Sequence, residues 1–486
     1  MKSKLLVLII FILLFLNGIT QPIALHPYNP HYFVYDGKPT LLITSAEHYG
    51  AVLNLDFGYK KYLKTMSDEG MNYTRIFTGS YVEIPGSFNI ENNTLSPVTG
   101  RFITPWKRTS EPGLFKGENK FDLSQWDEEY FMRLNDFISE ADKYDIVVEV
   151  TLFCSTYQDA SWERNPFNHQ NNINGLPVLD RKKSNTIYNG ELIDYQKKMV
   201  QKIVFELNDF DNVFYEIQNE PWSDDPQKAT RILWTHDPAT ARWTGYSETA
   251  SKASLAWQKI IAQTIVDTEK KMSKKHLIAQ NYCNFKHSLE EIDPNISILN
   301  FHYAWPDAAW LNYAWNRPIG FDESGFSENS DTTYLRQAWS FMLAGGALFN
   351  NLDYSFAVGY EDGTAKSDAP GKGSKELRAM LKRMHNFIKA FDFIKMAPDR
   401  DVVFHSPGLI SQALSEKGKQ YAIYFSGKPS GFIKLDLPKG RYNYELISPY
   451  DGKPLKKGFT THDGGIYKME VPGFDQMAVL RILNQK

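Results

Sequence analysis

Short, nearly continuous apolar runs alternate with amphipathic stretches along most of this chain, and this alternation limits its fold more than any other feature. Runs rich in Val, Ile, Leu and Phe are typical of strands that are buried on both faces. Eight such runs are predicted strands: Thr40–Ala46, Tyr73–Thr78, Ile146–Phe153, Val213–Ile217, Leu277–Asn281, Ser297–His302, Ile319–Asp322 and Ala347–Leu352. Eight strand–helix repeats predict the α/β class and a (β/α)₈ TIM barrel.

The segments between these strands have helical spacing. Predicted helices are Phe57–Glu69, Asp122–Tyr144, Leu192–Leu207, Ser247–Met272 and Glu376–Ala390. Asp122 or Ser124 is a plausible cap for the second of them. A doubly wound open sheet is the alternative, but its early Gly-rich phosphate loop is not found in the sequence.

The first residues have the pattern of a secretory signal peptide. Lys2 and Lys4 precede an apolar run from Leu5 to Leu16, and small polar residues follow it. A run of 12 residues is short for a membrane span, which needs about 20. We therefore expect residues 1–21 to be a signal peptide and the protein to be secreted or periplasmic, with no membrane span in the mature chain. A retained anchor is the alternative.

The composition changes after Phe393, where seven short apolar segments are separated by turn sequences such as Pro438-Lys439-Gly440. These segments predict a small C-terminal β-sandwich domain over residues 396–486. The barrel domain is then residues 22–395. It begins with a predicted hairpin, in which Asp36-Gly37-Lys38 is the turn.

Composition and motifs exclude several classes of function. The formal net charge is −3, without a long basic run, which argues against a nucleic-acid partner. Cys154 and Cys283 are the two cysteines, too few for a disulfide scaffold or a cysteine metal site. No calcium-loop or zinc spacing is found. We therefore expect neither a cofactor nor a metal.

Two glutamates follow predicted strands that face each other across the mouth of the barrel. Strand four leads into Asn219-Glu220-Pro221-Trp222, and strand seven ends at Asp322-Glu323. A pair of carboxyl groups across a cleft, one protonated and one ionised, is the requirement for glycoside hydrolysis. Neighbouring strand residues point to opposite sides, so we expect Glu323 rather than Asp322 to face the pocket.

Other candidate substrate-binding residues also follow predicted strands. Arg75 ends strand two and is a candidate cation for the carboxyl pair. The remaining candidates are Asn219, His302, Tyr303, Trp222, Trp305 and His48. Flat aromatic rings at a barrel mouth would suit the C–H faces of sugar rings, although each Trp could equally serve loop packing.

The Asn-Glu-Pro after strand four and the Glu ending strand seven resemble the clan A glycoside hydrolases, including the cellulase-like family 5. The start from His26-Pro27 to Gly37-Lys38 resembles apiosidase-like bacterial enzymes of that group, which often carry a collagen-binding-like C-terminal β domain. The resemblance implies a retaining mechanism with Glu220 as acid/base and Glu323 as nucleophile. It also implies that Asn219 binds the sugar 2-hydroxyl and that Arg75 steadies the nucleophile. The clan usually separates the His and Tyr after strand six by one residue, whereas His302 and Tyr303 are adjacent here.

The sequence therefore predicts an exported glycoside hydrolase that acts on a β-linked carbohydrate, in a plant or algal polysaccharide or oligosaccharide. Two alternatives from other classes remain. One is a non-catalytic glycan-binding protein that uses the barrel, and the other is an adhesin that binds through the β-sandwich. Neither alternative needs the pair of strand-end carboxylates.

Overall fold

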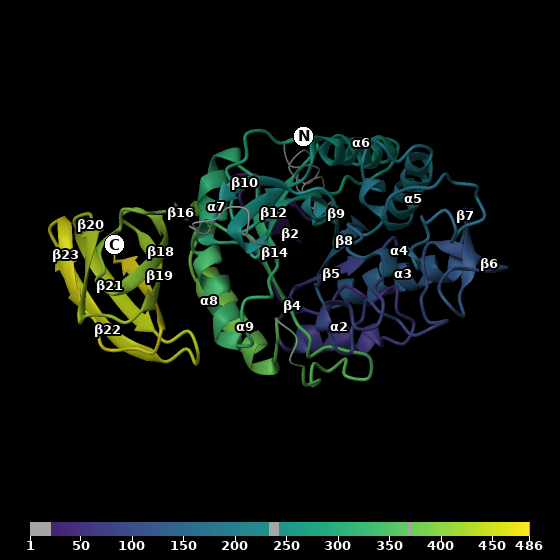
Figure 1. Cartoon of the computed structure of the whole chain (residues 1–486). Coiled ribbons are helices and arrows are strands. Elements are labelled where there is room, and N and C mark those ends of the chain that lie inside the picture. Colours follow the sequence, from purple (N-terminus) through teal and green to yellow (C-terminus); the bar gives the residue numbers. More distant parts are fainter. Residues whose placement is uncertain (1–20, 233–242, 368, 370, 486) are drawn as a thin grey trace, which may run out of the picture.

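The computed structural model describes residues 21–232, 243–367, 369 and 371–485. It contains a barrel of eight parallel strands wrapped by helices, with a smaller β domain beside it (Figure 1). The predicted (β/α)₈ class is therefore confirmed. The predicted signal peptide lies, except for Gln21, outside the described residues.

All eight predicted barrel strands are present, each within a few residues of its predicted limits. They are β4 (Leu42–Ala46), β5 (Tyr73–Phe77), β8 (Val147–Cys154), β9 (Val213–Asn219), β12 (Ile278–Asn284), β13 (Ile298–His302), β14 (Ile319–Glu323) and β15 (Leu348–Leu352). The order around the barrel is β4-β15-β14-β13-β12-β9-β8-β5, and every ladder in this path is parallel. Every residue of these strands is buried, as their apolar runs predict.

The side chain of Asn72 bridges the seam between the first and last strands of this path, β4 and β5. Its Oδ1 accepts a hydrogen bond from the backbone N–H of Ile43 (3.0 Å), and its Nδ2 donates to the carbonyl of Leu41 (2.8 Å). The amide thus satisfies the backbone groups of β4 that a ladder would otherwise pair.

Helices cover the outside of the barrel. The main ones are α2 (Tyr59–Asp68), α3 (Glu128–Asp142), α5 (Leu192–Leu207), α6 (Lys252–Glu269), α7 (Pro306–Asn312), α8 (Asp331–Met342) and α9 (Lys375–Lys389). Two predicted helix starts are wrong. Asp127, not Asp122 or Ser124, caps α3, because its side chain accepts from the N–H of Glu129. Residues 246–249 form a strand before α6, whose cap is Ser251.

Loops above the strands carry short elements that the sequence did not predict. Two hairpins are formed by β6 (Trp106–Pro112) with β7 (Asn119–Trp126), and by β10 (Gln227–Arg231) with β11 (Tyr246–Thr249). A short helix, α4, spans Asp159–Trp162. The 3₁₀ turns are η1 (Ser87–Asn89), η2 (Arg181–Lys183), η3 (Pro221–Ser223), η4 (Trp243–Gly245), η5 (Tyr313–Trp315) and η6 (Phe393–Lys395).

A three-stranded sheet lies at the amino-terminal end of the barrel: β1 (Ala24–Leu25), β2 (Phe33–Tyr35) and β3 (Lys38–Thr40). Asp36 and Gly37 connect β2 to β3 with φ angles of 47° and 67°. Two positive φ values in a two-residue loop are typical of the type I′ hairpin turn. The predicted hairpin is therefore present. The N–H of Ile23 bonds to the carbonyl of Asp211, just before β9.

The C-terminal strands form two sheets around a core of their own. The larger sheet has the order β16-β18-β19-β24-β21-β22, and the smaller β17-β20-β23. The strands are β16 (Ala397–Pro398), β17 (Val403–His405), β18 (Leu409–Glu416), β19 (Gln420–Gly427), β20 (Phe432–Leu437), β21 (Gly440–Ile447), β22 (Pro454–His462), β23 (Gly465–Glu470) and β24 (Met477–Asn484). All seven predicted segments lie in this set, and β16 and β22 are additional.

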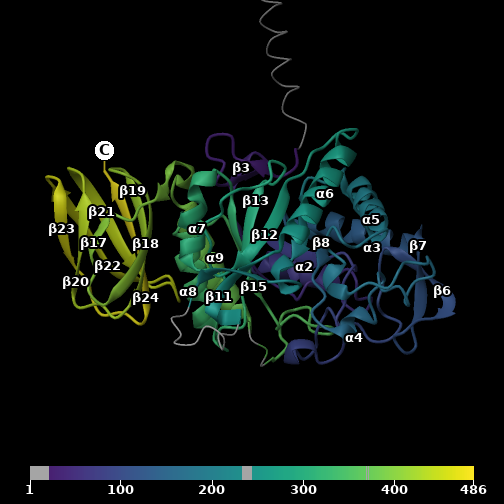
Figure 2. The same cartoon turned by 45° about the horizontal axis from the view of Figure 1, so that its top comes forward.

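This small β domain packs against the α8 side of the barrel, as both views show (Figures 1 and 2). The rings of Trp339 on α8 and Tyr424 on β19 are stacked, with their centroids 6.3 Å apart. Tyr424 and Met477 belong to the same buried cluster as the barrel core. Within the described residues, no helix is both long and apolar enough to cross a membrane.

Asn72→Ala is expected to destabilise the barrel because it leaves the backbone groups of Leu41 and Ile43 without partners at the seam. The expected loss is about 1–3 kcal/mol of unfolding free energy, measured by urea titration. Gln125→Ala, at an exposed position, is the control and should change stability by no more than about 0.5 kcal/mol. Equal stability of both variants would show that the seam does not depend on this amide.

Candidate active site

A cavity of about 270 Å³ opens at the carboxyl ends of the barrel strands. This is the end at which TIM barrels place their functional residues. Its lining residues come from every barrel strand or the loop that follows it: His48, Tyr49, Phe77, Tyr81, Glu83, Phe88, Leu95, Tyr157, Asn219, Glu220, Trp222, Ser223, Glu248, Asn284, Tyr303, Glu323, Phe326 and Leu352.

Glu220 stands directly after β9 in a left-handed backbone conformation, with φ 45° and ψ 55°. Its N–H donates to Oδ1 of Asn281 (3.0 Å), and its carbonyl accepts from the hydroxyl of Ser155 (2.8 Å). These two bonds hold a conformation that is unfavourable for a residue other than Gly. In the carboxyl group, Oε2 accepts from the hydroxyl of Tyr157 (2.9 Å).

Glu323 ends β14, and its two oxygens have different partners. Oε2 accepts from the hydroxyl of Tyr49 (2.9 Å) and lies 3.4 Å from Nη1 of Arg75. Oε1 accepts from the hydroxyl of Tyr303 (2.9 Å). Glu323 is 6% exposed, and its facing partner Glu220 is 8% exposed, so both carboxyl groups reach the cavity but are largely removed from water.

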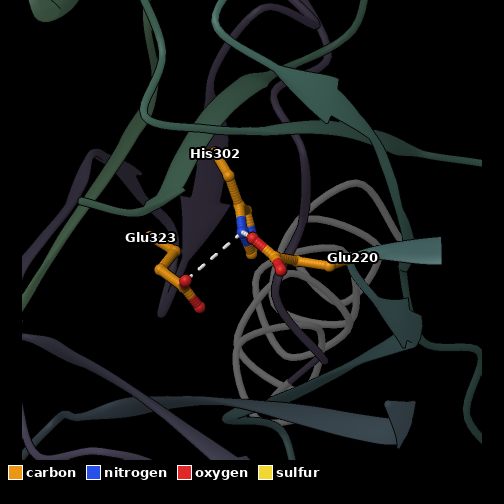
Figure 3. Close-up of side chains that lie close together, drawn as sticks. All are labelled: Glu220, His302 and Glu323. Atoms are coloured by element: carbon orange, nitrogen blue, oxygen red, sulfur yellow. Dashed lines mark hydrogen bonds and ion pairs between the residues drawn. The ribbon is translucent and has the colours of Figure 1, made fainter. Parts of the chain in front are cut away.

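His302 and Tyr303 both reach the carboxyl pair although they are adjacent in the chain. Nδ1 of His302 lies 3.0 Å from Oε1 of Glu220 and 3.5 Å from Oε1 of Glu323 (Figure 3). The hydroxyl of Tyr303 is 3.1 Å from Glu220 and 2.9 Å from Glu323. Tyr303 has a φ of 49°, and this turn brings its ring to the same side as His302.

Glu323 lines the cavity and Asp322 does not, but Asp322 also points into the barrel interior. Asp322 is fully buried, with Oδ2 3.4 Å from Arg75 and 3.5 Å from Nε2 of His302. The pairing of β13 with β14 passes from Phe301–Phe321 to His302–Glu323, which leaves Asp322 as an extra residue. Such a bulge interrupts the alternation of side chains.

Arg75 lies beneath the carboxyl pair at the centre of a buried polar network. It is 0% exposed, and Nη2 bonds to Glu216 and to Oδ1 of Asn219 (2.9 Å). Its guanidinium also reaches Glu149 at 3.9 Å. One cation thus faces carboxylates from β8, β9 and β14, and its planar fork can serve several of them at once.

The pKa values of the carboxyl pair move in opposite directions in the free protein. Burial raises the pKa of Glu220, but hydrogen bonds from His302, Tyr157 and Tyr303 and the charge of His302 outweigh it, so the pKa is lowered. For Glu323, burial and the charge of Glu220 prevail over His302 and Arg75, and the pKa is raised. The two carboxyl groups thus influence each other, because the charge of Glu220 helps to raise the pKa of Glu323.

Not every predicted site residue lines the cavity. Asn219, Glu220, Trp222, Tyr303, Glu323 and His48 do, and Arg75 and His302 contact the carboxyl pair from below. Trp305 does not: it caps the start of α7 and packs against Phe285 and Lys286. Three further lining residues were not predicted from the sequence: Tyr49, Tyr157 and Glu83. All three follow predicted strands within a few residues.

Two groups of side chains have the spacing of a metal site. Glu220, His302 and Glu323 offer ligand atoms within 4.8 Å of one another, as do Glu149, Glu216 and Asp322. In the second group Arg75 already supplies the positive charge. In the first, tyrosine hydroxyls and Arg75 already bond to the carboxylate oxygens. The donor atoms are thus satisfied by protein groups.

Solved structures with the same fold are numerous. A candidate glycoside hydrolase from Bacteroides vulgatus matches over 96% of this chain and 83% of its own, with a TM-score of 0.66 and 14% identity. A glycoside hydrolase family 5 protein from the same species matches over 96% and 94%, with a TM-score of 0.60 and 12% identity. At such identities the likeness concerns the fold, and it spans both the barrel and the C-terminal sheets. No protein-family model and no curated protein matches the sequence.

Arg75→Leu is expected to destabilise the protein strongly because buried carboxylates lose their cation. Breaking a buried ion pair in this way costs about 3–5 kcal/mol, which denaturant titration at neutral pH would measure. Lys64→Leu, which removes the exposed pair with Asp68, is the control and should change stability little. A small effect for Arg75→Leu would mean that the carboxylates lose their charge instead.

The buried carboxyl group of Asp224 should make the free energy of unfolding fall as pH rises. Burial raises its pKa to about 7, against hydrogen bonding from Ser155. Because the folded pKa exceeds the unfolded one, this contribution is complete below about pH 4 and is lost as pH rises through about 7. Asp224→Asn should therefore flatten the stability profile between these values, by at most about 1.4 kcal/mol per pH unit. The exposed neighbour variant Asp225→Asn should keep the parent slope; an unchanged slope in Asp224→Asn would contradict the assignment.

Proposed function

We propose that this protein is an exported, retaining glycoside hydrolase that cleaves a β-linked carbohydrate. The observation that carries the proposal is the approach of Glu220 and Glu323, whose nearest ligand atoms lie within 4.8 Å across a cavity at the catalytic end of a (β/α)₈ barrel. The family 5 description of the neighbour from Bacteroides vulgatus supports the same class. Export rests on the N-terminal sequence pattern.

The spacing of the carboxyl groups favours retention over inversion. Inverting enzymes leave room for a water between carboxyl groups about 6.5–9.5 Å apart, whereas retaining enzymes hold them about 5–5.5 Å apart. One oxygen of Glu220 and one of Glu323 lie within 4.8 Å of each other, which favours the shorter separation. In that arrangement one carboxylate attacks the sugar itself.

Two displacements at the anomeric carbon follow from this geometry. Glu323 attacks that carbon and forms a glycosyl ester, while the bond to the leaving oxygen breaks and Glu220 gives this oxygen its proton. Glu220, now ionised, then takes a proton from water, and the water oxygen attacks the same carbon and releases Glu323. Proton transfer of this kind contributes about 10²–10⁴-fold.

Arg75 and Tyr49 supply what the attacking carboxylate needs. Both contact Oε2 of Glu323, so they stabilise its anion and leave Oε1 to face the cavity with Tyr303. Tyr303 contacts both carboxyl groups, so its hydroxyl holds the two groups in position relative to each other. The reactive form has the proton on Glu220.

Asn219 is placed to bind the sugar 2-hydroxyl, the role that the clan A resemblance implies. Its Oδ1 is fixed by Arg75, and its Nδ2 by Tyr157 (2.8 Å). Both bonds orient the amide at the cavity wall between the two carboxyl groups. A hydrogen bond to the 2-hydroxyl that strengthens in the transition state would add several kcal/mol.

Glu220→Gln and Glu323→Gln should each lower kcat by several orders of magnitude on any glycoside that the parent cleaves, because each removes one half of the two-step chemistry. The measurement is sugar release from a panel of aryl β-glycosides and plant or algal oligosaccharides. Glu140→Gln is a matched control: Glu140 is also 8% exposed but lies on α3, outside the cavity.

Azide rescue then separates the two roles. In Glu323→Ala, azide can attack an activated aryl glycoside in place of the carboxylate and give the glycosyl azide of inverted configuration. In Glu220→Ala, azide would instead intercept the glycosyl-enzyme and give the retained azide. Exchanged configurations would reverse the assignment, and full activity of both Gln variants would overturn the proposal.

A further inference from the structure

The cavity has a second polar end, formed by Glu83 and His48. Both side chains line the cavity, and Nε2 of His48 lies 3.6 Å from Oε1 of Glu83. Glu83 is held rigidly: Tyr81 donates to Oε1 (3.2 Å) and Asn93 to Oε2. Nδ1 of His48 lies 3.2 Å from the hydroxyl of Tyr354. The catalytic steps above use neither Glu83 nor His48.

The separation of His48 and Glu83 leaves a place for a hydroxyl. At 3.6 Å the two groups attract each other, but they are too far apart for a good hydrogen bond. Burial lowers the pKa of His48, but Glu83, Glu323 and Glu47 together outweigh it and raise the pKa, which favours a donating Nε2–H. A sugar hydroxyl carries one donor and two acceptor sites, so it can accept from His48 and donate to Glu83 at once.

This end of the cavity lies on the glycone side of the scissile bond. Glu220 must protonate the leaving oxygen, so the leaving group lies near Glu220 with Trp222 and Glu248, on the β9 and β12 side. His48 follows β4, and Glu83 follows the neighbouring strand β5. Around the barrel the order here is β14, β15, β4 and β5. The hydroxyl that they meet thus belongs to the glycone.

Aromatic side chains also narrow the mouth of the cavity. The ring of Phe88, after β5, packs edge-on against Tyr157 and Phe326, with ring centroids 5.3 Å and 6.4 Å apart. These residues follow three different strands, β5, β8 and β14, so the contacts link loops across the mouth. A volume of about 270 Å³ is below the usual range for ligand pockets, about 300–1,000 Å³. A volume of this size suits one sugar ring.

We propose that His48 and Glu83 select a terminal sugar, so that the enzyme removes single units from the non-reducing end. The inference rests on the proposed glycosidase function and specifies its substrate. Glu83 accepts the proton of a free hydroxyl, and an internal unit linked through that oxygen has no proton to give. Its next sugar would also meet the wall formed by Glu83, Phe88 and Leu95.

The size of the first products tests the mode of action. With reducing-end-labelled oligosaccharides of a sugar that the parent cleaves as an aryl glycoside, the label should move down one unit at a time while the monosaccharide accumulates. Early appearance of short labelled fragments would overturn this inference but leave the hydrolase standing. No hydrolysis of aryl glycosides would overturn both.

Glu83→Gln tests the residue. On aryl monoglycosides, kcat/KM should fall about 10- to 100-fold, the size of a lost hydrogen bond to a charged group. For the parent enzyme, kcat/KM should fall by a similar factor on one deoxy-glycoside, the analogue that lacks the hydroxyl bound by Glu83. For Glu83→Gln, kcat/KM should be the same on that analogue as on the unmodified glycoside. Glu91→Gln, an exposed change in the same loop, is the control.

A purely structural role for Glu83 predicts a different result. Glu83→Gln would then lose activity by the same factor on the unmodified glycoside and on every deoxy analogue. That outcome would overturn the assignment of Glu83 as a hydroxyl-binding residue. His48→Gln provides a second test at the other partner of the same hydroxyl. Its kcat/KM should also stay the same when that same hydroxyl is removed from the glycoside. If removal of a different hydroxyl is the one without effect, the two residues do not share a hydroxyl.

Discussion

The buried guanidinium of Arg75 is the interaction on which the candidate site depends. Carboxylates from β8, β9 and β14 project into one small interior space, where their charges would repel one another in a medium of low polarity. Arg75 reaches Glu149, Glu216, Asp322 and Glu323. Burial still raises the pKa of Glu216 to about 7. The guanidinium of Arg75 thus offsets the negative charge of the barrel interior and contacts one of the two strand-end glutamates.

Irregular backbone at the strand ends turns this interior into a site. Tyr49, Glu220, Tyr303 and Phe326 all line the cavity, and all have φ between 45° and 59°. Left-handed conformations are costly for such residues and persist where the surroundings hold them, often at functional sites. The bulge at Asp322 acts in the same way. Regular strands would alternate these side chains, whereas the irregular ends direct successive ones toward a common centre.

The loops decide the shape of the cavity and so the proposed substrate. The barrel itself would present an open mouth, but the segment after β5 brings Glu83, Phe88 and Leu95 over it. Phe88 contacts aromatic rings that follow β8 and β14. The closure is thus formed by contacts between residues distant in sequence. The two strand-end glutamates are the basis of the proposed reaction class, and these loop contacts restrict what can enter.

The sequence by itself determined the barrel, the order of its strands and the two strand-end glutamates, because these depend on local patterns. Buried parallel strands must be apolar throughout, and Glu220 and Glu323 stand directly after such runs. Tertiary structure alone decided that Asp322 joins the interior, that Tyr303 bridges both carboxyl groups and that Trp305 packs elsewhere. It also paired Glu83 with His48. These outcomes arise from bulges, left-handed residues and contacts across the mouth, whose energies depend on neighbours far along the chain and leave no periodic signal in it.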